Sequence, residues 1–379
     1  MSMSVKSTLQ RSSGAIRLLE AHDRISTEIV RDMKGLDGES FEGIWISGLT
    51  QTTYLGIPDT EIVSPLYRAI LQATNLNALS SRSRPLCIAF DADSGGPISD
   101  IPALVAVLAE IGVSMVIIED KVLKEPGKKV NSLLSANGSQ SQADATEFGK
   151  IIQTFKKCAE GTDLMITARI ESFNVRITQD DPDEEAASIQ SSLEDALSRA
   201  EIYKKCGADA IMIHSKSTKP TEVLNFLVRF RQTDQTTPLV VVPTTYSTTS
   251  RQSLVDAGAN VIIYANHLMR AKIQAIENPL WKCLSQNPYL FEGDEEARAC
   301  VAARNYGCLL RILPERQYRE SENVIFTTLL AEMRREAIRN MRAVTMELAG
   351  GTESGCEADS KIIPVKDLLN INAVHLMTL

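Results

Sequence analysis

Several features that would narrow the function at once are missing from this chain of 379 residues. Its seven cysteines form no C-x-x-C pair, which disfavours zinc ribbons and disulfide frameworks and fits reduced thiols in a cytoplasmic protein. No G-x-G-x-x-G motif follows an apolar run, so the usual dinucleotide-binding turn is absent. Runs of about 18 apolar residues are also lacking, as is an apolar signal segment near the first residue, and we therefore expect a soluble, intracellular protein.

Blocks of basic residues are lacking as well. The chain has 40 Lys and Arg against 48 Asp and Glu, which gives a net charge of −8. A general nucleic-acid partner or an anionic membrane surface would need a basic face, so we expect neither. Any binding of an anion must come from a local group of charges.

Short apolar runs with many β-branched residues recur along the chain and predict eight strands. The runs are Ile16–His22, Gly43–Ser47, Leu86–Asp91, Met115–Glu119, Leu164–Arg169, Ala210–His214, Leu239–Val242 and Val261–Tyr264. Segments with helical spacing lie between them, for example Phe148, Ile152 and Phe155. This alternation predicts a (β/α)8 barrel of the TIM type, while a doubly wound sheet, which usually has fewer strands, is the competing layout.

The region after the eighth run has a different composition. Residues 297–348 are rich in Arg, Glu, Ala, Leu and Met and predict helices, and Gly350–Gly355 predicts a linker. We therefore divide the chain into a barrel domain, 1–278, and a helical C-terminal extension, 279–379.

Polar residues gather where the predicted strands end. They are His22, Trp45 to Leu49, Asp91, Asp93, Glu119, Arg169, His214, Ser215 and Asn266. In a barrel these ends share one mouth, where substrates bind. So many charged groups beside apolar strands would be costly to bring together without a metal or an ionic ligand, which favours an enzyme.

Three acidic residues at the ends of two neighbouring strands suggest a metal. Asp91-Ala92-Asp93 presents two carboxylates on one face, and Glu119 ends the next strand. Oxygen ligands of this kind suit Mg²⁺, although many such pairs are merely solvated. Beyond Glu119, Lys121 opens a stretch with Lys124, Lys128 and Lys129 around Pro126-Gly127, which predicts a cationic loop beside an anionic substrate.

Three further positions allow two interpretations each. The turn at Trp45-Ile46-Ser47-Gly48-Leu49 can cradle an anion with backbone N–H groups, or it can be an ordinary strand-to-helix turn. Arg169 offers a planar fork for a carboxylate or phosphoryl group, or an internal ion pair with Glu171. His214 can be a catalyst or a hydrogen-bonded structural residue.

Taken together, nine motifs resemble the phosphoenolpyruvate mutase family of the isocitrate lyase superfamily. They are EAHDRISTEIV (20–30), FEGIWISGL (41–49), LGIPDTE (55–61), DADSG (91–95), IEDK with NSL (118–133), ARIESF (168–173), GADAIMIHSK (207–216), VVPT (241–244) and ANHLMRA (265–271). The resemblance implies a (β/α)8 barrel whose last helix is exchanged between subunits of a homodimer or homotetramer. It also implies a Mg²⁺ cofactor and the interconversion of phosphoenolpyruvate and phosphonopyruvate, the first step of phosphonate biosynthesis.

The resemblance assigns roles to particular residues. It implies that Asp91 is the main metal anchor, assisted by Asp93 and Glu119. The pyruvyl part of the substrate would lie against the turn at Trp45, Ser47, Gly48 and Leu49, with Ser215 nearby. The phosphoryl group would be held by Arg169, His214 and Asn131, with Asp59 beside its path and Lys121 supporting the loop.

Some positions depart from the family, and alternatives stay open. The stretch between Lys121 and Asn131 is longer than in the mutases, and Thr245 stands where the family has a lysine. The K-x-C-G-H loop of the superfamily's lyases is absent, which argues against C–C bond lysis. A phosphonopyruvate hydrolase, a mutase of a related enolpyruvyl ester and a barrel without catalysis remain as alternatives; Asn131-Ser132 favours the mutase.

Overall fold

The computed structural model describes residues 3–12, 14–35, 38–55, 63–77, 84–122, 141–273 and 275. Within these residues, eight parallel strands close a barrel in the order β1, β10, β9, β8, β7, β4, β3, β2. Their bounds are Ile16–Glu20 (β1), Gly43–Ile46 (β2), Cys87–Asp91 (β3), Met115–Glu119 (β4), Met165–Ile170 (β7), Ala210–Ile213 (β8), Leu239–Val241 (β9) and Val261–Tyr264 (β10). Each predicted run overlaps one of these strands, so the predicted barrel is confirmed.

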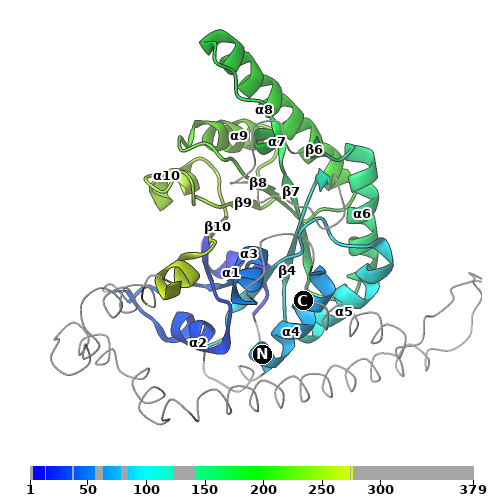
Figure 1. The fold of residues 1–379 in the computed structure, drawn as a ribbon, viewed down its shortest axis with the longest axis vertical. Helices are drawn as coiled ribbons and strands as arrows, with labels where there is room; N and C mark the ends of the chain where they lie inside the picture. Colours follow the sequence, from blue (N-terminus) through cyan, green and yellow to red (C-terminus); the bar gives the residue numbers. More distant parts are fainter. Residues whose placement is uncertain are drawn as a thin grey trace, which may run out of the picture. The chain divides into compact units, whose positions relative to one another are not determined.

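Helices alternate with the strands and surround them, as Figure 1 shows. They are α1 (Val5–Arg11), α2 (Arg24–Asp32), α3 (Gly48–Tyr54), α4 (Pro65–Asn77), the 3-10 turn η1 (Ile98–Asp100), α5 (Ile101–Glu110), α6 (Ala145–Cys158), α7 (Ser172–Val175), α8 (Pro182–Lys205), α9 (Thr221–Arg231) and α10 (Arg251–Asp256). A short antiparallel pair, β5 (Lys121–Val122) and β6 (Ser141–Gln142), follows β4 outside the barrel.

The two-residue period of the strands divides the core into two layers. Side chains that point inward fill the barrel, for example Ile16 and Leu18 on β1 or Met115 and Ile117 on β4. Side chains that point outward pack under the helices, where Phe155 of α6 is fully buried. A fully buried aliphatic or aromatic side chain contributes about 1.5–3 kcal/mol to folding, so both layers stabilise the closed barrel.

Local sequence signals explain where the long helices begin and end. Asp144 accepts hydrogen bonds from the first backbone N–H groups of α6, and Asp181 does the same for α8, whose first residue is Pro182. After α8, Gly207 has φ of 101°, a backbone conformation that favours glycine and ends the helix. The inner face of α8, which includes Ala196 and Tyr203, is fully buried.

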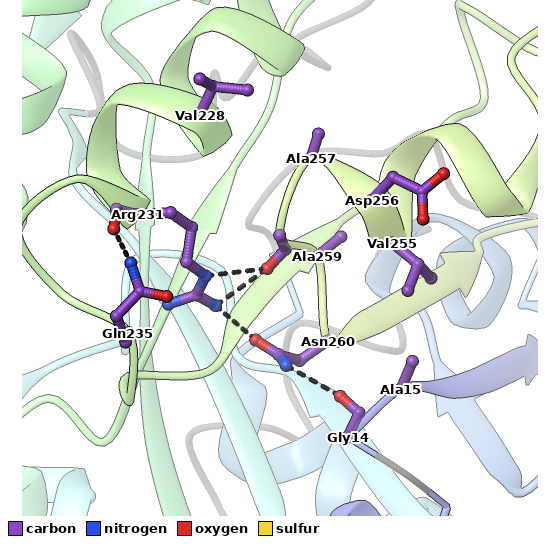
Figure 2. A pocket seen from close by; sticks show the side chains of 11 residues that line it. Gly14, Ala15, Val228, Arg231, Gln235, Val255, Asp256, Ala257, Ala259 and Asn260 are labelled. Atoms are coloured by element: carbon purple, nitrogen blue, oxygen red, sulfur yellow. Dashed lines mark hydrogen bonds between the residues drawn. The ribbon is translucent and has the colours of Figure 1, made fainter.

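Helix α1 covers the amino-terminal ends of the strands. Helix α1 packs Val5 and Leu9 against the barrel interior, and the Val5 N–H donates to Ser114 Oγ at 3.0 Å. Beside it lies a shallow hollow of about 400 Å³, in which Arg231 donates to the Gly258 carbonyl and to Asn260 Oδ1 (Figure 2). These bonds tie α9 to the start of β10, so we assign this end a structural role.

Some predictions fall on residues outside the described ranges. These are Asp59, Asn131, the cationic stretch with Lys124, Lys128 and Lys129, the helices of 297–348, the linker 350–355 and the exchanged last helix, and with them the extension 279–379. Among the described residues, no helix has the length and apolar character that crossing a membrane requires.

Candidate active site at the carboxyl ends of the strands

The alternation that fills the barrel with apolar side chains also produces the polar layer at its mouth. On each of four strands, the side chains that point into the barrel form a row. Each row begins with an apolar residue and ends in a group that can ionise or hydrogen bond. The rows are Cys87, Ala89, Asp91 on β3; Met115, Ile117, Glu119 on β4; Met165, Thr167, Arg169 on β7; and Ala210, Met212, then His214 after β8. Four of the predicted site residues therefore lie on adjacent strands at one end of the barrel.

Backbone contacts hold the three predicted metal ligands beside one another. The Glu119 N–H donates to the Asp93 carbonyl at 2.7 Å, so the tip of β4 is fixed to the turn after β3. Asp93 has φ of 49°, a left-handed conformation that is uncommon for residues other than glycine and that often occurs at functional sites. Its N–H donates to Asp91 Oδ1 at 3.2 Å, and the Gly48 N–H donates to Asp91 Oδ2 at 3.0 Å.

Gly48 leaves room beside both carboxylates. A Cβ at this position would lie 3.2 Å from Asp91 Oδ2 and 3.3 Å from Asp93 Oδ1. The absence of a side chain therefore keeps open a space that carboxylate oxygens border on two sides. In the described part of the chain, no three His, Cys, Asp or Glu side chains already converge as a complete metal cluster. Mg²⁺ commonly binds one or two carboxylates and keeps several waters, so this donor set fits that ion in chemistry.

Arg68 of α4 is a charged neighbour that the sequence does not predict. Its side chain is 1% exposed, and its guanidinium donates to Asp93 Oδ2 at 2.5 Å and to Gln51 Oε1 at 2.7 Å. It also lies over the ring of Phe90, 5.3 Å from the ring centroid. Arg68 thus neutralises one carboxylate of the D-x-D pair and ties it to α3. The available signal was an Arg within the apolar face of a helix.

On the other side of Glu119, charges of opposite sign alternate. Lys121 Nζ lies 3.2 Å from Glu119 Oε1, and Arg169 Nη1 lies 3.2 Å from Glu119 Oε2. The Nε of Arg169 pairs with Glu171, which is fully buried. Burial opposes ionisation of Glu171, yet the charge of Arg169 lowers its pKa below the usual range. Burial alone would lower the pKa of Arg169, but Glu171 and Glu119 raise it, so the guanidinium stays charged.

His214 stands beside this cluster as a neutral base. It is 4% exposed, and burial together with the nearby charge of Arg169 lowers its pKa to about 4. Within the described residues its Nδ1 atom has no hydrogen-bond partner. A buried, neutral imidazole with an unused ring nitrogen can donate to or accept from a ligand without adding charge.

The remaining predicted residues lie around the same mouth in different orientations. Ser47 precedes α3 as its N-cap, Leu49 is half-buried in the first turn of that helix, and Trp45 points into the barrel. The indole N–H of Trp45 finds no acceptor among the described residues. Ser215 differs, because its hydroxyl donates to Glu222 on α9 and therefore faces away from the barrel.

These observations define a class of protein: a parallel barrel whose mouth brings carboxylates beside an arginine and a neutral histidine. Comparison with known proteins narrows the class. The chain belongs to the phosphoenolpyruvate phosphomutase family, within the isocitrate lyase/PEP mutase superfamily, because that family's model matches residues 5–284.

Individual relatives agree with this family. The phosphoenolpyruvate phosphomutase of Tetrahymena pyriformis is 33% identical over 261 residues, which are 69% of this chain and 76% of the relative. The phosphonopyruvate hydrolase of a Variovorax strain is 27% identical over 241 residues, which are 62% and 73%. The crystal structure of a phosphoenolpyruvate phosphomutase from Streptomyces platensis subsp. rosaceus aligns with a TM-score of 0.61 and 27% identity, covering 86% of this chain and 98% of that one. Both mutases and a hydrolase are thus similar to this chain.

Proposed function

We propose that this protein is a Mg²⁺-dependent phosphoenolpyruvate mutase, an isomerase that interconverts phosphoenolpyruvate and 3-phosphonopyruvate in the synthesis of a phosphonate. The observation that carries the proposal is the arrangement around Arg169. This guanidinium lies between Glu119 and Glu171 and beside the neutral His214. An anionic group that enters the mouth can replace a carboxylate as the partner of Arg169, because both accept hydrogen bonds from the same planar fork.

The proposed division of labour follows the charges. Arg169 and His214 would bind the phosphoryl oxygens, and the turn at Ser47, Gly48 and Leu49 would orient the pyruvyl part. Asp91, Asp93 and Glu119 would hold Mg²⁺, which supplies positive charge next to the pyruvyl oxygens and so stabilises an enolate. A loosely bonded phosphoryl group in transit needs positioning and charge stabilisation more than covalent help, and these residues offer both.

The ion pairs of the described site support this assignment. Glu119 is 3% exposed and contacts both Lys121 and Arg169, so two cationic side chains hold it in place before any ligand binds. Preorganised charges need little rearrangement during the reaction. Lys121 would keep Glu119 oriented while Arg169 turns to the phosphoryl group. Asn131 stays a predicted contact of that group, and Asp59 a predicted neighbour of its path.

The test is phosphorus NMR of phosphonopyruvate incubated with the protein and Mg²⁺. We expect the phosphonate resonance to be replaced by that of phosphoenolpyruvate, with a matched sample of Arg169→Gln protein unchanged over the same time. Inorganic phosphate together with pyruvate would contradict the proposal.

A phosphonopyruvate hydrolase is the second candidate, favoured by the similarity of the Variovorax hydrolase. Both reactions break the same P–C bond and differ in whether the enolate or water receives the phosphoryl group. Asn131 is the residue that we expect to favour return to the enolate, because an amide can donate to the phosphoryl oxygens and occupy the position of a water. Replacing Asn131 by Ala should therefore raise the share of inorganic phosphate among the products.

A mutase of a related enolpyruvyl ester remains a third possibility, and phosphorus NMR of substituted phosphonopyruvates separates it from the first. The homodimer or homotetramer predicted from the resemblance stays a prediction. Light scattering of the full chain at micromolar concentration tests it, and a monomer would contradict it.

A further inference from the structure

One side chain in the E-D-K motif points away from the mouth and has no part in the chemistry proposed above. Asp120 is fully buried and lies between the barrel and α8. Its Oδ2 atom accepts hydrogen bonds from the Tyr203 hydroxyl at 2.6 Å, from Gln142 Nε2 at 2.8 Å and from an Arg199 nitrogen at 3.3 Å. Its Oδ1 atom accepts from the Glu171 N–H at 2.9 Å.

The backbone of Asp120 is fixed as firmly as its side chain. Its N–H donates to the Arg169 carbonyl at 3.1 Å, and its carbonyl accepts from the Ala143 N–H at 2.7 Å. Ala143 follows β6, so one residue joins β4, β7, the β5–β6 pair and α8. Burial of a carboxylate is costly unless donors surround it, and here four donors surround the Asp120 carboxylate.

The residues that these bonds fix are those of the site. Asp120 stands between Glu119 and Lys121 in the chain, and its bonds reach the backbone of Arg169 and Glu171 directly. Because alternate residues of an extended chain point to opposite sides, holding Asp120 outward directs Glu119 and Lys121 inward. The ion pairs among these four residues therefore share one anchor behind them.

We propose that Asp120, held by Tyr203 and Arg199 of α8, is a positioning residue of the active site that fixes Glu119 and Lys121 against Arg169 and Glu171. The inference rests on the proposed function for its catalytic part, because it assigns Glu119 to the metal and Arg169 to the phosphoryl group. It extends the functional unit from the mouth to α8, whose residues are not among the proposed substrate contacts.

Tyr203→Phe is the variant of choice, because it deletes one hydroxyl and leaves the packing of the ring against Phe148 intact. Tyr246→Phe is a matched control, since Tyr246 is also fully buried and its hydroxyl is not among the hydrogen-bond donors to Asp120. Asp120→Asn is a stronger change. An amide has one acceptor oxygen in place of two, so it cannot accept both from the Tyr203 hydroxyl and from the Glu171 N–H.

Two measurements decide the proposal. Binding of Mn²⁺, followed by electron paramagnetic resonance without substrate, should weaken about tenfold in Tyr203→Phe and up to about 100-fold in Asp120→Asn. At saturating metal, kcat for phosphonopyruvate should fall about tenfold in Tyr203→Phe while KM changes by less than about twofold, since positioning acts on the transition state. Tyr246→Phe should match the wild type in both.

The outcomes separate the two proposals. Wild-type Mn²⁺ affinity and kcat in Tyr203→Phe would overturn the positioning role, as would a raised KM with unchanged kcat. If the wild type does not convert phosphonopyruvate, the proposed function fails, and the Mn²⁺ affinities alone decide the role of Asp120. Loss of folding in Asp120→Asn leaves the decision to Tyr203→Phe.

Discussion

The two ends of the barrel each hold a partly buried arginine, and the partners of these arginines differ. At the amino-terminal end, Arg231 donates to the backbone carbonyls of Gly258 and Thr237 and to Asn260 Oδ1. Burial lowers its pKa, and its acceptors carry no charge. At the carboxyl end, Glu171 and Glu119 raise the pKa of Arg169 against the effect of burial.

The difference separates a structural role from a functional one. Carbonyl groups belong to the fold, so Arg231 cannot exchange them without releasing the start of β10. Carboxylate side chains are anions, and a substrate anion can take their place beside Arg169. Arg231 among carbonyls is therefore a fixed connection, whereas the carboxylate partners of Arg169 agree with the anion-binding role proposed above.

The largest effect on turnover should come from β3, whose inward side chains run from Cys87 at the buried end to Asp91 at the mouth. Asp91→Ala should lower turnover by about 10³-fold, because it removes the proposed main metal ligand, and folding should survive. Cys87→Ala, four residues earlier on the same face, should cost about 1 kcal/mol of unfolding free energy and leave turnover unchanged. Near wild-type turnover of Asp91→Ala after chelation and return of Mg²⁺ would remove Asp91 from the metal site.

The two arginines offer the next comparison. Arg169→Lys keeps the charge but loses the planar fork, so kcat should fall about 10²-fold with little change in unfolding free energy. Arg231→Lys should do the reverse and lower the unfolding free energy by about 1–3 kcal/mol while kcat stays unchanged. Denaturant titration and steady-state kinetics measure both. If the two variants behaved alike, the distinction between the two ends would be wrong.

Gly48 tests whether the space beside the carboxylates is used. In Gly48→Ala the new Cβ would press on Asp91 Oδ2 and Asp93 Oδ1. Activity should fall about tenfold, mostly because Mg²⁺ binds more weakly. Gly35→Ala is the control, because its Cβ would meet only the Glu39 carbonyl at an ordinary 3.6 Å. Equal Mg²⁺ dependence in both variants would argue that the space holds no ion.

The last comparison concerns pH and His214. Its pKa of about 4 lies below the ordinary value of 6.5, so the unfolded chain binds a proton that the folded chain does not between these two pH values. Stability from the neutral imidazole is complete above about pH 6.5 and is lost as pH falls towards 4, by at most about 1.4 kcal/mol per pH unit. Urea titrations of His214→Gln from pH 7 to pH 4 should show a shallower loss than the wild type. Parallel curves would mean that His214 is protonated in the folded protein.

Much of the fold could be predicted from sequence, because parallel strands buried on both sides appear as uninterrupted apolar runs. The same period places Asp91, Glu119, Arg169 and His214 on inward rows, and the structure brings them together at one mouth. Ser215 follows His214, so alternation alone turns its hydroxyl outward to Glu222. The two-residue period therefore separates Ser215 from the site.

Other parts could not be predicted because tertiary packing decides them. Arg68 reaches Asp93 from α4, 25 residues earlier in the chain, and no local pattern indicates that pairing. The β5–β6 pair has two residues in each strand, too few to show a period. Asp59 and Asn131 lie outside the described residues, so their predicted roles depend on experiment.

The central claim is that the mouth holds the phosphoryl group and returns it to the enolate without water. Phosphonopyruvate converted in ¹⁸O-labelled water, with products followed by phosphorus NMR, tests this directly, because ¹⁸O bonded to phosphorus shifts its resonance. The proposed mutase reaction predicts phosphoenolpyruvate whose three terminal phosphoryl oxygens carry no ¹⁸O; the bridging oxygen comes from the keto group, which exchanges with water independently of the enzyme. Inorganic phosphate containing one ¹⁸O atom would contradict it.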